Sequence, residues 1–243
     1  MNRRSAARLG RWIAPLATLF FSACSASKHP GDVLVTNVAD LVPHSDSDHF
    51  VYASERDEGG KTLERTLMVE HVSTSETPGE FQVTESANGV QTGDTRWIAD
   101  EHGIALLSEE VEGLGVRLQY DPPLLFFPQP LLAGEHRAAA TGSATSLEDG
   151  QPLGLFHASV VVKSNTIRSS HPLASGKTVA FEVTRSIEGP NGALVIHVDS
   201  VNAEGVGEIE SIAALEGFPF VIRRSLVCGL IKGHPVGQCD MLK

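Results

Sequence analysis

This 243-residue chain lacks the sequence motifs by which many enzymes, cofactor-binding proteins and membrane-spanning proteins are identified. Its most apolar run, residues 12–23, is shorter than the roughly 20 residues that a membrane-spanning helix needs. The chain has no phosphate-binding glycine loop, no zincin helix, no Cys-x-x-Cys pair and no Gly-x-Ser-x-Gly elbow. We therefore expect neither an enzyme nor a bound cofactor or metal ion.

Positive charge is scarce as well. The chain has 19 Lys and Arg residues against 30 Asp and Glu residues, and residues 1–23 hold four of the arginines and no acidic residue. Without that segment the net charge is 15 − 30 = −15. Because phosphate binding needs clustered Lys and Arg, we expect no nucleic-acid partner and no direct attraction to an anionic lipid surface.

The N-terminus has the layout of an export signal, in which arginines precede the apolar run and the run ends at Cys24. The sequence Phe21-Ser-Ala-Cys24 resembles a bacterial lipobox, whose cysteine is acylated and becomes the first residue of the mature chain. This resemblance implies a membrane anchor through lipid on Cys24 and a location in the cell envelope. Ser25, where Asp would retain a lipoprotein in the inner membrane of enteric bacteria, favours the outer membrane facing the periplasm. Two alternatives stay open: an ordinary signal cleaved after Ala26, and an uncleaved anchor.

Acylation of Cys24 would leave two cysteines, Cys228 and Cys239. An even pair in an oxidising compartment favours a disulfide, and the glycine-rich segment between them can fold back. Closing this short loop would stabilise the C-terminal end by about 2–3 kcal/mol. The alternative is a metal site formed by both thiolates and His234, which would lack a fourth ligand nearby.

Short segments of alternating polarity dominate the rest of the chain, with tight-turn sequences such as Gly59-Gly60 and Asn88-Gly89 between them. This spacing predicts an all-β fold: a strongly curved antiparallel sheet, an open barrel or a sandwich, with few or no helices. We divide the chain into a signal peptide at 1–23, a polar tether at 24–32 and a single all-β domain at 33–243. The expected strands include 50–56, 63–71, 81–85, 96–99, 104–107, 116–120, 155–162, 179–183 and 193–198, while 209–215 is either a short helix or a strand.

Residues 121–134 depart from this pattern. Four prolines in fourteen residues cannot form a helix or a central strand, so we expect the segment to interrupt the strands. Its large apolar side chains either plug one end of the sheet core or form an apolar lip for a lipid or a partner. These side chains are Leu124, Leu125, Phe126, Phe127, Leu131 and Leu132.

A family resemblance rests on three segments: Leu41-Val-Pro43, Phe50-Val-Tyr-Ala53 and the proline-rich Tyr120-Asp-Pro-Pro-Leu-Leu-Phe-Phe-Pro-Gln-Pro-Leu-Leu-Ala-Gly134. Together they are similar to a broad group of uncharacterised bacterial envelope lipoproteins, which look related to the curved-sheet lipoprotein carriers LolA and LolB. The resemblance covers residues 40–215. It implies a LolA/LolB-like or DUF3108-like β fold and transfers no catalytic residue.

Two polar clusters are interpreted as solvated segments. His44-Ser-Asp-Ser-Asp-His49 contains potential metal ligands, but mixed runs of this kind usually lie in exposed loops. The acidic run Glu109, Glu110 and Glu112 is interpreted as a solvated turn, although carboxylates this close could raise one another's pKa.

Two functions fit these expectations. The first is a membrane-anchored, non-catalytic binding or assembly module whose partner is another envelope protein. The second is a carrier that holds an acyl chain or another hydrophobic ligand in the concavity of the sheet. The module predicts a filled core, whereas the carrier predicts an apolar cavity that opens to solvent and is lined in part by residues 124–132.

Overall fold

A computed structural model describes residues 29–111, 114–174, 176–189 and 192–239. The expected signal peptide, 1–23, and the expected acylation site Cys24 lie outside these residues. The elements are β1 (Val33–Val35), η1 (Val38–Asp40), β2 (His49–Glu58), β3 (Lys61–Thr74), β4 (Glu80–Ala87), β5 (Val90–Asp100), β6 (Gly103–Val111), β7 (Val116–Pro128), β8 (Leu131–Leu132), β9 (Gly134–Ser146), β10 (Pro152–Ile167), β11 (Thr178–Gly189), β12 (Gly192–Ala203), β13 (Gly207–Leu215), β14 (Phe220–Ile231) and β15 (His234–Gly237).

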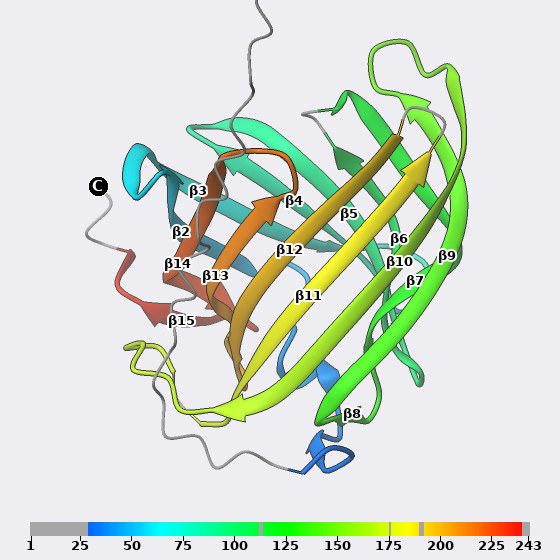
Figure 1. The fold of residues 1–243 in the computed structure, drawn as a ribbon. Helices are drawn as coiled ribbons and strands as arrows, with labels where there is room; N and C mark the ends of the chain where they lie inside the picture. The colour runs from blue at the N-terminus through cyan, green and yellow to red at the C-terminus, as the bar shows by residue number, and fades with distance from the viewer. Residues whose placement is uncertain (1–28, 112–113, 175, 190–191, 240–243) are drawn as a thin grey trace, which may run out of the picture.

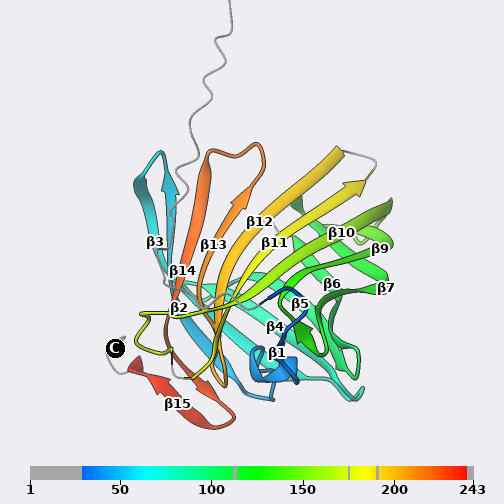
Figure 2. The same ribbon diagram turned by 60° about the horizontal axis from the view of Figure 1, so that its bottom comes forward.

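The predicted all-β class is confirmed, and the sheet closes on itself as a 12-stranded antiparallel barrel (Figures 1 and 2). Each barrel strand pairs with its neighbour in the sequence, except that β8 leaves the ring between β7 and β9. Strand β14 completes the ring by pairing with β13 on one side and β2 on the other. No α-helix occurs among the described residues, and 209–215 belongs to strand β13.

Within the described residues, no helical segment has the length and apolar character needed to cross a membrane.

Local turn chemistry explains the hairpins at one end of the barrel. Asn88 and Gly89 both have positive φ, 52° and 78°, between the paired residues Ala87 and Val90. Positive φ at both central positions is the type I′ geometry, whose twist matches that of the flanking strands. We call this end of the barrel, which holds the connections β2–β3, β4–β5, β6–β7, β9–β10, β11–β12 and β13–β14, the hairpin end.

The proline-rich segment is partly strand, contrary to our expectation. Strand β7 continues through Pro122 and Pro123 to Pro128 and pairs with β6 again beyond them. The prolines are accommodated because the ladder is interrupted there: residue 119 faces Ser108, and the next residue paired with β6 is Leu124. Proline is tolerated at such irregularities because it needs no ladder hydrogen bond.

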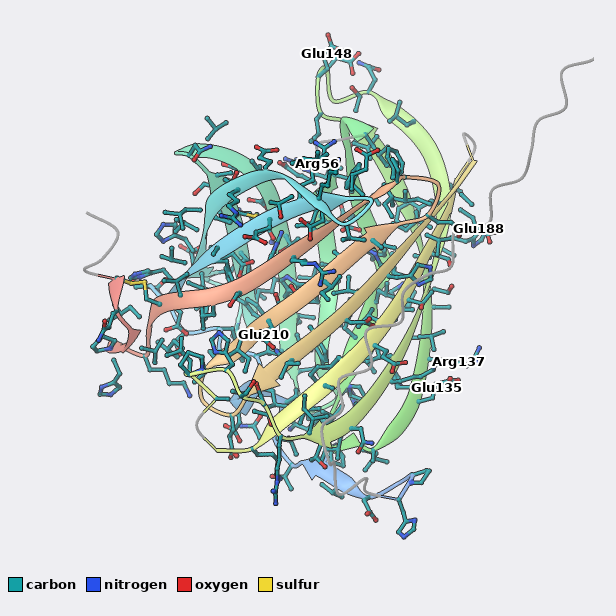
Figure 3. The ribbon with its side chains drawn as sticks, turned by 60° about the vertical axis from the view of Figure 1, so that its left-hand side comes forward. Arg56, Glu135, Arg137, Glu148, Glu188 and Glu210 are labelled. Atoms are coloured by element: carbon teal, nitrogen blue, oxygen red, sulfur yellow. A yellow bond between two sulfur atoms is a disulfide. The ribbon has the colours of Figure 1, made fainter. Side chains whose placement is uncertain are left out.

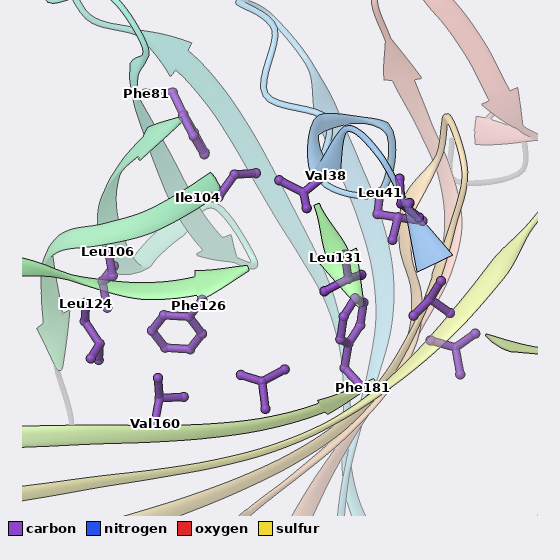
Figure 4. Close-up of a cluster of buried hydrophobic side chains, with 14 of the residues drawn as sticks. Val38, Leu41, Phe81, Ile104, Leu106, Leu124, Phe126, Leu131, Val160 and Phe181 are labelled. Atoms are coloured by element: carbon purple, nitrogen blue, oxygen red, sulfur yellow. The ribbon is translucent and has the colours of Figure 1, made fainter. Parts of the chain in front are cut away.

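The other end of the barrel is filled by the segment 29–43, which we call the plug (Figure 2). Leu34, Val38 and Leu41 are at most 2% exposed. The plug is fixed by polar contacts to the β10–β11 connection and to the end of β12, since Lys177 Nζ donates to Leu34 O at 2.6 Å and Asn202 Nδ2 donates to Leu41 O at 3.0 Å. Figure 4 shows Val38 and Leu41 facing the cluster that includes Leu131, Phe126, Phe181 and Val160.

Charged side chains cover the outer wall, where Glu135, Arg137 and Glu188 point away from the barrel and Glu148 lies at a hairpin tip (Figure 3). Inside, Phe156 packs edge-on against Tyr120, with ring centroids 5.2 Å apart. Gly142 is needed beside them, because a Cβ there would lie 2.0 Å from Gln119 O and 2.5 Å from the Phe156 ring. Side chains of β7, β9, β10 and β11 thus fill one side of the interior.

Candidate functional site: the barrel cavity

Between these side chains and the plug, a cavity of about 460 Å³ remains inside the barrel and is partly open to solvent. The plug contributes Val42 and Pro43 to its boundary, and strands β2–β7 and β11–β14 supply most of the wall. The wall is mainly apolar, but it also carries six glutamate and arginine side chains that point inward from the strands. These six are Glu70, Glu85, Glu109, Glu208, Arg185 and Arg224.

One side of the cavity holds the Arg224 cluster, formed by Arg224 with Glu70, Glu85 and Glu208. The Arg224 guanidinium donates from Nη1 to Glu70 Oε1 and to Glu85 Oε1, both at 3.2 Å, and from Nη2 to Glu85 Oε2 at 3.2 Å. Glu208 accepts a 2.7 Å hydrogen bond from Ser211 Oγ. One guanidinium therefore stands among three carboxyl groups, which leaves the cluster at 1 − 3 = −2 if all are ionised.

Burial and mutual repulsion change the acidity of this cluster. Loss of water, followed by the charge of Glu85, raises the pKa of Glu70 to about 8. Burial also raises the pKa of Glu208, while Arg224 opposes that rise. The Tyr52 hydroxyl donates to the backbone oxygen of Glu208 at 3.3 Å, and burial raises the pKa of Tyr52 well above its usual value. Near neutral pH the cluster therefore keeps a proton on Glu70.

A second polar group crosses the interior. Arg185 on β11 donates from Nη1 to both carboxylate oxygens of Glu109 on β6, at 2.9 and 2.8 Å. Tyr120 on β7 donates its hydroxyl to the same carboxylate. The Glu109 and Arg185 side chains are only 8% and 14% exposed, so a buried ion pair with matched charge links distant strands.

Aromatic side chains form another part of the wall. Trp97 on β5 contacts Phe126 on β7 edge-on, with centroids 5.3 Å apart, and lies 6.5 Å from Phe81 on β4. Phe127 stacks edge-on against Phe181 at 5.1 Å. The cavity is thus amphipathic, with apolar aromatic faces on β4–β7 and the Arg224 cluster on β3, β4, β13 and β14.

The proline-segment residues predicted from the sequence are divided by the structure between core and cavity. Phe126 and Phe127 line the cavity. Leu124 and Leu131 are buried in the core at 0% and 1% exposure, whereas Leu132 is 43% exposed. Leu125 is partly buried, and its backbone oxygen lies 3.3 Å from His136 Nε2.

The expected disulfide is confirmed: Cys228 and Cys239 are bonded and join β14 to the segment after β15. Within the 44–49 run, Asp48 is buried rather than solvated. Its carboxylate accepts hydrogen bonds from the backbone amides of Ser45 and Lys232, at 2.9 and 2.6 Å. His44 stacks on Phe81 at 4.6 Å. Within the described residues, no three His, Cys, Asp or Glu side chains converge as metal ligands.

The solvated-turn interpretation is wrong for Glu109, which is buried against Arg185. Glu110 forms an ion pair with Arg117 on the neighbouring strand, and Glu112 lies outside the described residues. Sequence reasoning also missed Glu70, Arg224 and the other cavity charges. The available signal was weak, because Glu70 alternates with Leu67 and Val69 but alternation alone does not say which face points inward.

Comparisons with known proteins assign this chain to no family. No protein-family model matches the chain, and no curated protein matches its sequence. The chain is similar to a crystal structure from Bacteroides fragilis described as a "putative exported protein with YmcC-like fold", with TM-score 0.44, 12% identity and coverage of 80% of this chain and 97% of the other. It is also similar to a "putative lipoprotein" from Parabacteroides distasonis, with TM-score 0.41, 9% identity and coverage of 86% and 100%.

Proposed function

We propose that this protein is a lipid-anchored, non-catalytic lipoprotein of the cell envelope that binds an amphipathic small molecule inside its barrel. One observation carries the proposal: a cavity of about 460 Å³ remains inside a closed barrel and combines aromatic walls with buried polar groups. Cavities of this size and composition are typical of small-molecule sites. The sequence hypothesis of a carrier is thereby favoured, with Phe126 and Phe127 in the cavity wall.

The hairpin end is the entry route in this proposal, because the plug fills the other end. Large apolar side chains are exposed at or near five of its connections: Leu63, Val90, Leu114, Leu155 and Phe218. Exposed apolar groups around an opening lower the cost of passing a hydrophobic ligand across it.

Filling the cavity should abolish binding. Ala213 on β13 lines the cavity, and Ala214 is the next residue on the same strand, so its side chain points to the other face. We would compare A213F with A214F in the acylated protein that begins at Cys24, in which Trp97 of the cavity wall is the only tryptophan. Energy transfer from Trp97 to the neutral dye N-phenyl-1-naphthylamine reports occupancy. Transfer should be lost in A213F and kept in A214F; equal transfer in both variants, or none in the parent protein, would contradict the proposal.

The anchor is tested separately. Replacing Cys24 with Ala removes the acylated sulfur, so the protein should move from the membrane to the soluble fraction. Ser25 favours the outer membrane, and separating inner and outer membranes on a density gradient checks that location. Membrane association that survives Cys24→Ala would show that another segment holds the protein.

A docking module for another envelope protein is the second candidate, and the exposed apolar residues of the hairpin end favour it. A photo-crosslinking side chain placed at Phe218 should then capture one partner that the same side chain at Glu135, on the outer wall, does not capture. Failure to crosslink at Phe218 would leave ligand entry as the role of these residues.

A further inference from the structure

The cavity has a charge imbalance that no protein group offsets within its wall. Four carboxyl groups and two guanidiniums line it, a difference of 2 − 4 = −2 if all are ionised. Arg185 is matched by Glu109 through two short hydrogen bonds. The surplus therefore lies on the other side of the cavity, with the Arg224 cluster.

Within that cluster, Glu208 has no cation within salt-bridge distance among the described residues, and it accepts a hydrogen bond from the Ser211 hydroxyl. Glu70 and Glu85 share the single guanidinium of Arg224. Burying an uncompensated negative charge is unfavourable, and this raises the pKa of Glu70 so that its carboxyl group tends to keep a proton. A bound cation would remove the need for that proton.

An anionic head group is disfavoured by the same arrangement. Both guanidiniums already face carboxylates, so an anion that approached either one would also approach Glu109, Glu70 or Glu85. Like charges at such separations repel strongly in a poorly solvated interior. Aromatic faces at Trp97 and Phe126 in the wall of the same cavity suit an apolar body.

We propose that the ligand is a cationic amphiphile, with its apolar body against Trp97, Phe126 and Phe127 and its ammonium group beside Glu70, Glu85 and Glu208. This inference rests on the proposed function, because it names the ligand class of the same cavity. The ammonium group donates hydrogen bonds to the carboxylates, and binding releases the proton that Glu70 otherwise holds.

Three ligands with the same chain length test the charge. Octylamine, octanol and octanoate are titrated at pH 7 into the acylated protein that begins at Cys24, held in phosphatidylcholine nanodiscs. The emission of Trp97, its one tryptophan, is the readout, and protein-free discs correct for partition. Octylamine should bind about tenfold more tightly than octanol, because charge-assisted hydrogen bonds to buried carboxylates are strong, and octanoate should bind most weakly. Octylamine affinity should rise between pH 6 and pH 8 as Glu70 gives up its proton, while octanol affinity should not change.

Variants locate the ammonium group. The double variant Glu70→Gln with Glu208→Gln should bind octylamine about tenfold more weakly and octanol unchanged, whereas Glu64→Gln, an exposed position on the same strand as Glu70, should alter neither. Unchanged octanol binding also shows that the double variant keeps its fold. Equal or better binding of octanoate, or a preference for octylamine that survives the double variant, would overturn the cationic assignment and leave the ligand-binding function standing. If none of the three ligands changes Trp97 emission, both proposals fail.

Discussion

Glu70 illustrates how the barrel changes the chemistry of a single side chain. Its carboxyl group faces Glu85 and Glu208 as well as Arg224, and the Tyr52 hydroxyl lies in the same polar region. Burial and the charge of Glu85 outweigh the attraction of Arg224, so the pKa of Glu70 is raised to about 8. The folded protein therefore binds this proton more tightly than the unfolded chain, where glutamate has its ordinary pKa near 4.3.

The sign of the resulting pH dependence follows from proton linkage. Between about pH 4.5 and pH 8 the folded state holds more protons than the unfolded state, so this group makes stability fall as pH rises. Glu70→Gln keeps the size of the side chain and removes the titration. We expect a flatter fall in Tm from pH 5 to pH 8.5 and a higher Tm than the parent protein at pH 8.5.

Thermal unfolding followed by circular dichroism across this pH range checks the expectation. Glu64→Gln is the control, because Glu64 is exposed on the same strand and should leave the curve unchanged. A Glu70→Gln curve with the slope of the parent protein would show that Glu70 is ionised in the folded state at neutral pH.

Strand β8, at the plugged end of the barrel, shows that two neighbouring leucines can have different roles. Strand β8 contains two leucines in succession, and it pairs with β1 of the plug. Leu131 is 1% exposed within the core cluster, while Leu132 is 43% exposed. Alternation along a strand sends successive side chains to opposite faces, so one leucine stabilises the plug and the other faces solvent.

This difference predicts unequal costs of truncation. Leu131→Ala removes buried methyl groups and leaves a cavity beside the plug, so it should lower the free energy of unfolding by about 2–5 kcal/mol. Leu132→Ala, the matched change one residue away, should alter it by less than about 1 kcal/mol. Urea denaturation measures both; similar losses for the two variants would mean that β8 does not seal the plug as described.

Closure of the ring is the property of the whole molecule on which the cavity depends. Strands β13 and β14 meet over five residue pairs, Glu210–Ala214 opposite Val221–Ser225, whereas β9 and β10 are paired over most of their length from Thr145 to Gly134. Fewer ladder hydrogen bonds hold the β13–β14 seam than hold the β9–β10 ladder, so local opening should begin at the seam.

Native-state hydrogen exchange tests this order. Amides of 210–214 and 221–225 should exchange through openings of lower free energy than amides of 136–144 and 156–162. Exchange of all four segments at the same free energy would instead show that the barrel opens only by global unfolding.

Much of the fold could be predicted because its signals are local. The Asn88-Gly89 and Gly59-Gly60 turns and the alternation of the flanking segments depend on neighbouring residues, and the observed hairpins follow them. The proline segment was harder, because whether β7 pairs again beyond Pro123 depends on β6 and not on the proline sequence. Within the site, only Phe126 and Phe127 belonged to a predicted set, as part of an apolar segment.

By itself, the sequence determined the all-β class, the pairing of Cys228 with Cys239 and the expectation of an exported, lipid-anchored chain, since short-range patterns and a count of cysteines are enough for these. Only the tertiary structure decided that the sheet closes and that a cavity remains inside it. It also brought Arg224 to Glu70 and Glu85, which stand 154 and 139 positions earlier in the chain. The physical reason is that strand register and ring closure, which are non-local, decide which inward-facing side chains meet across the barrel.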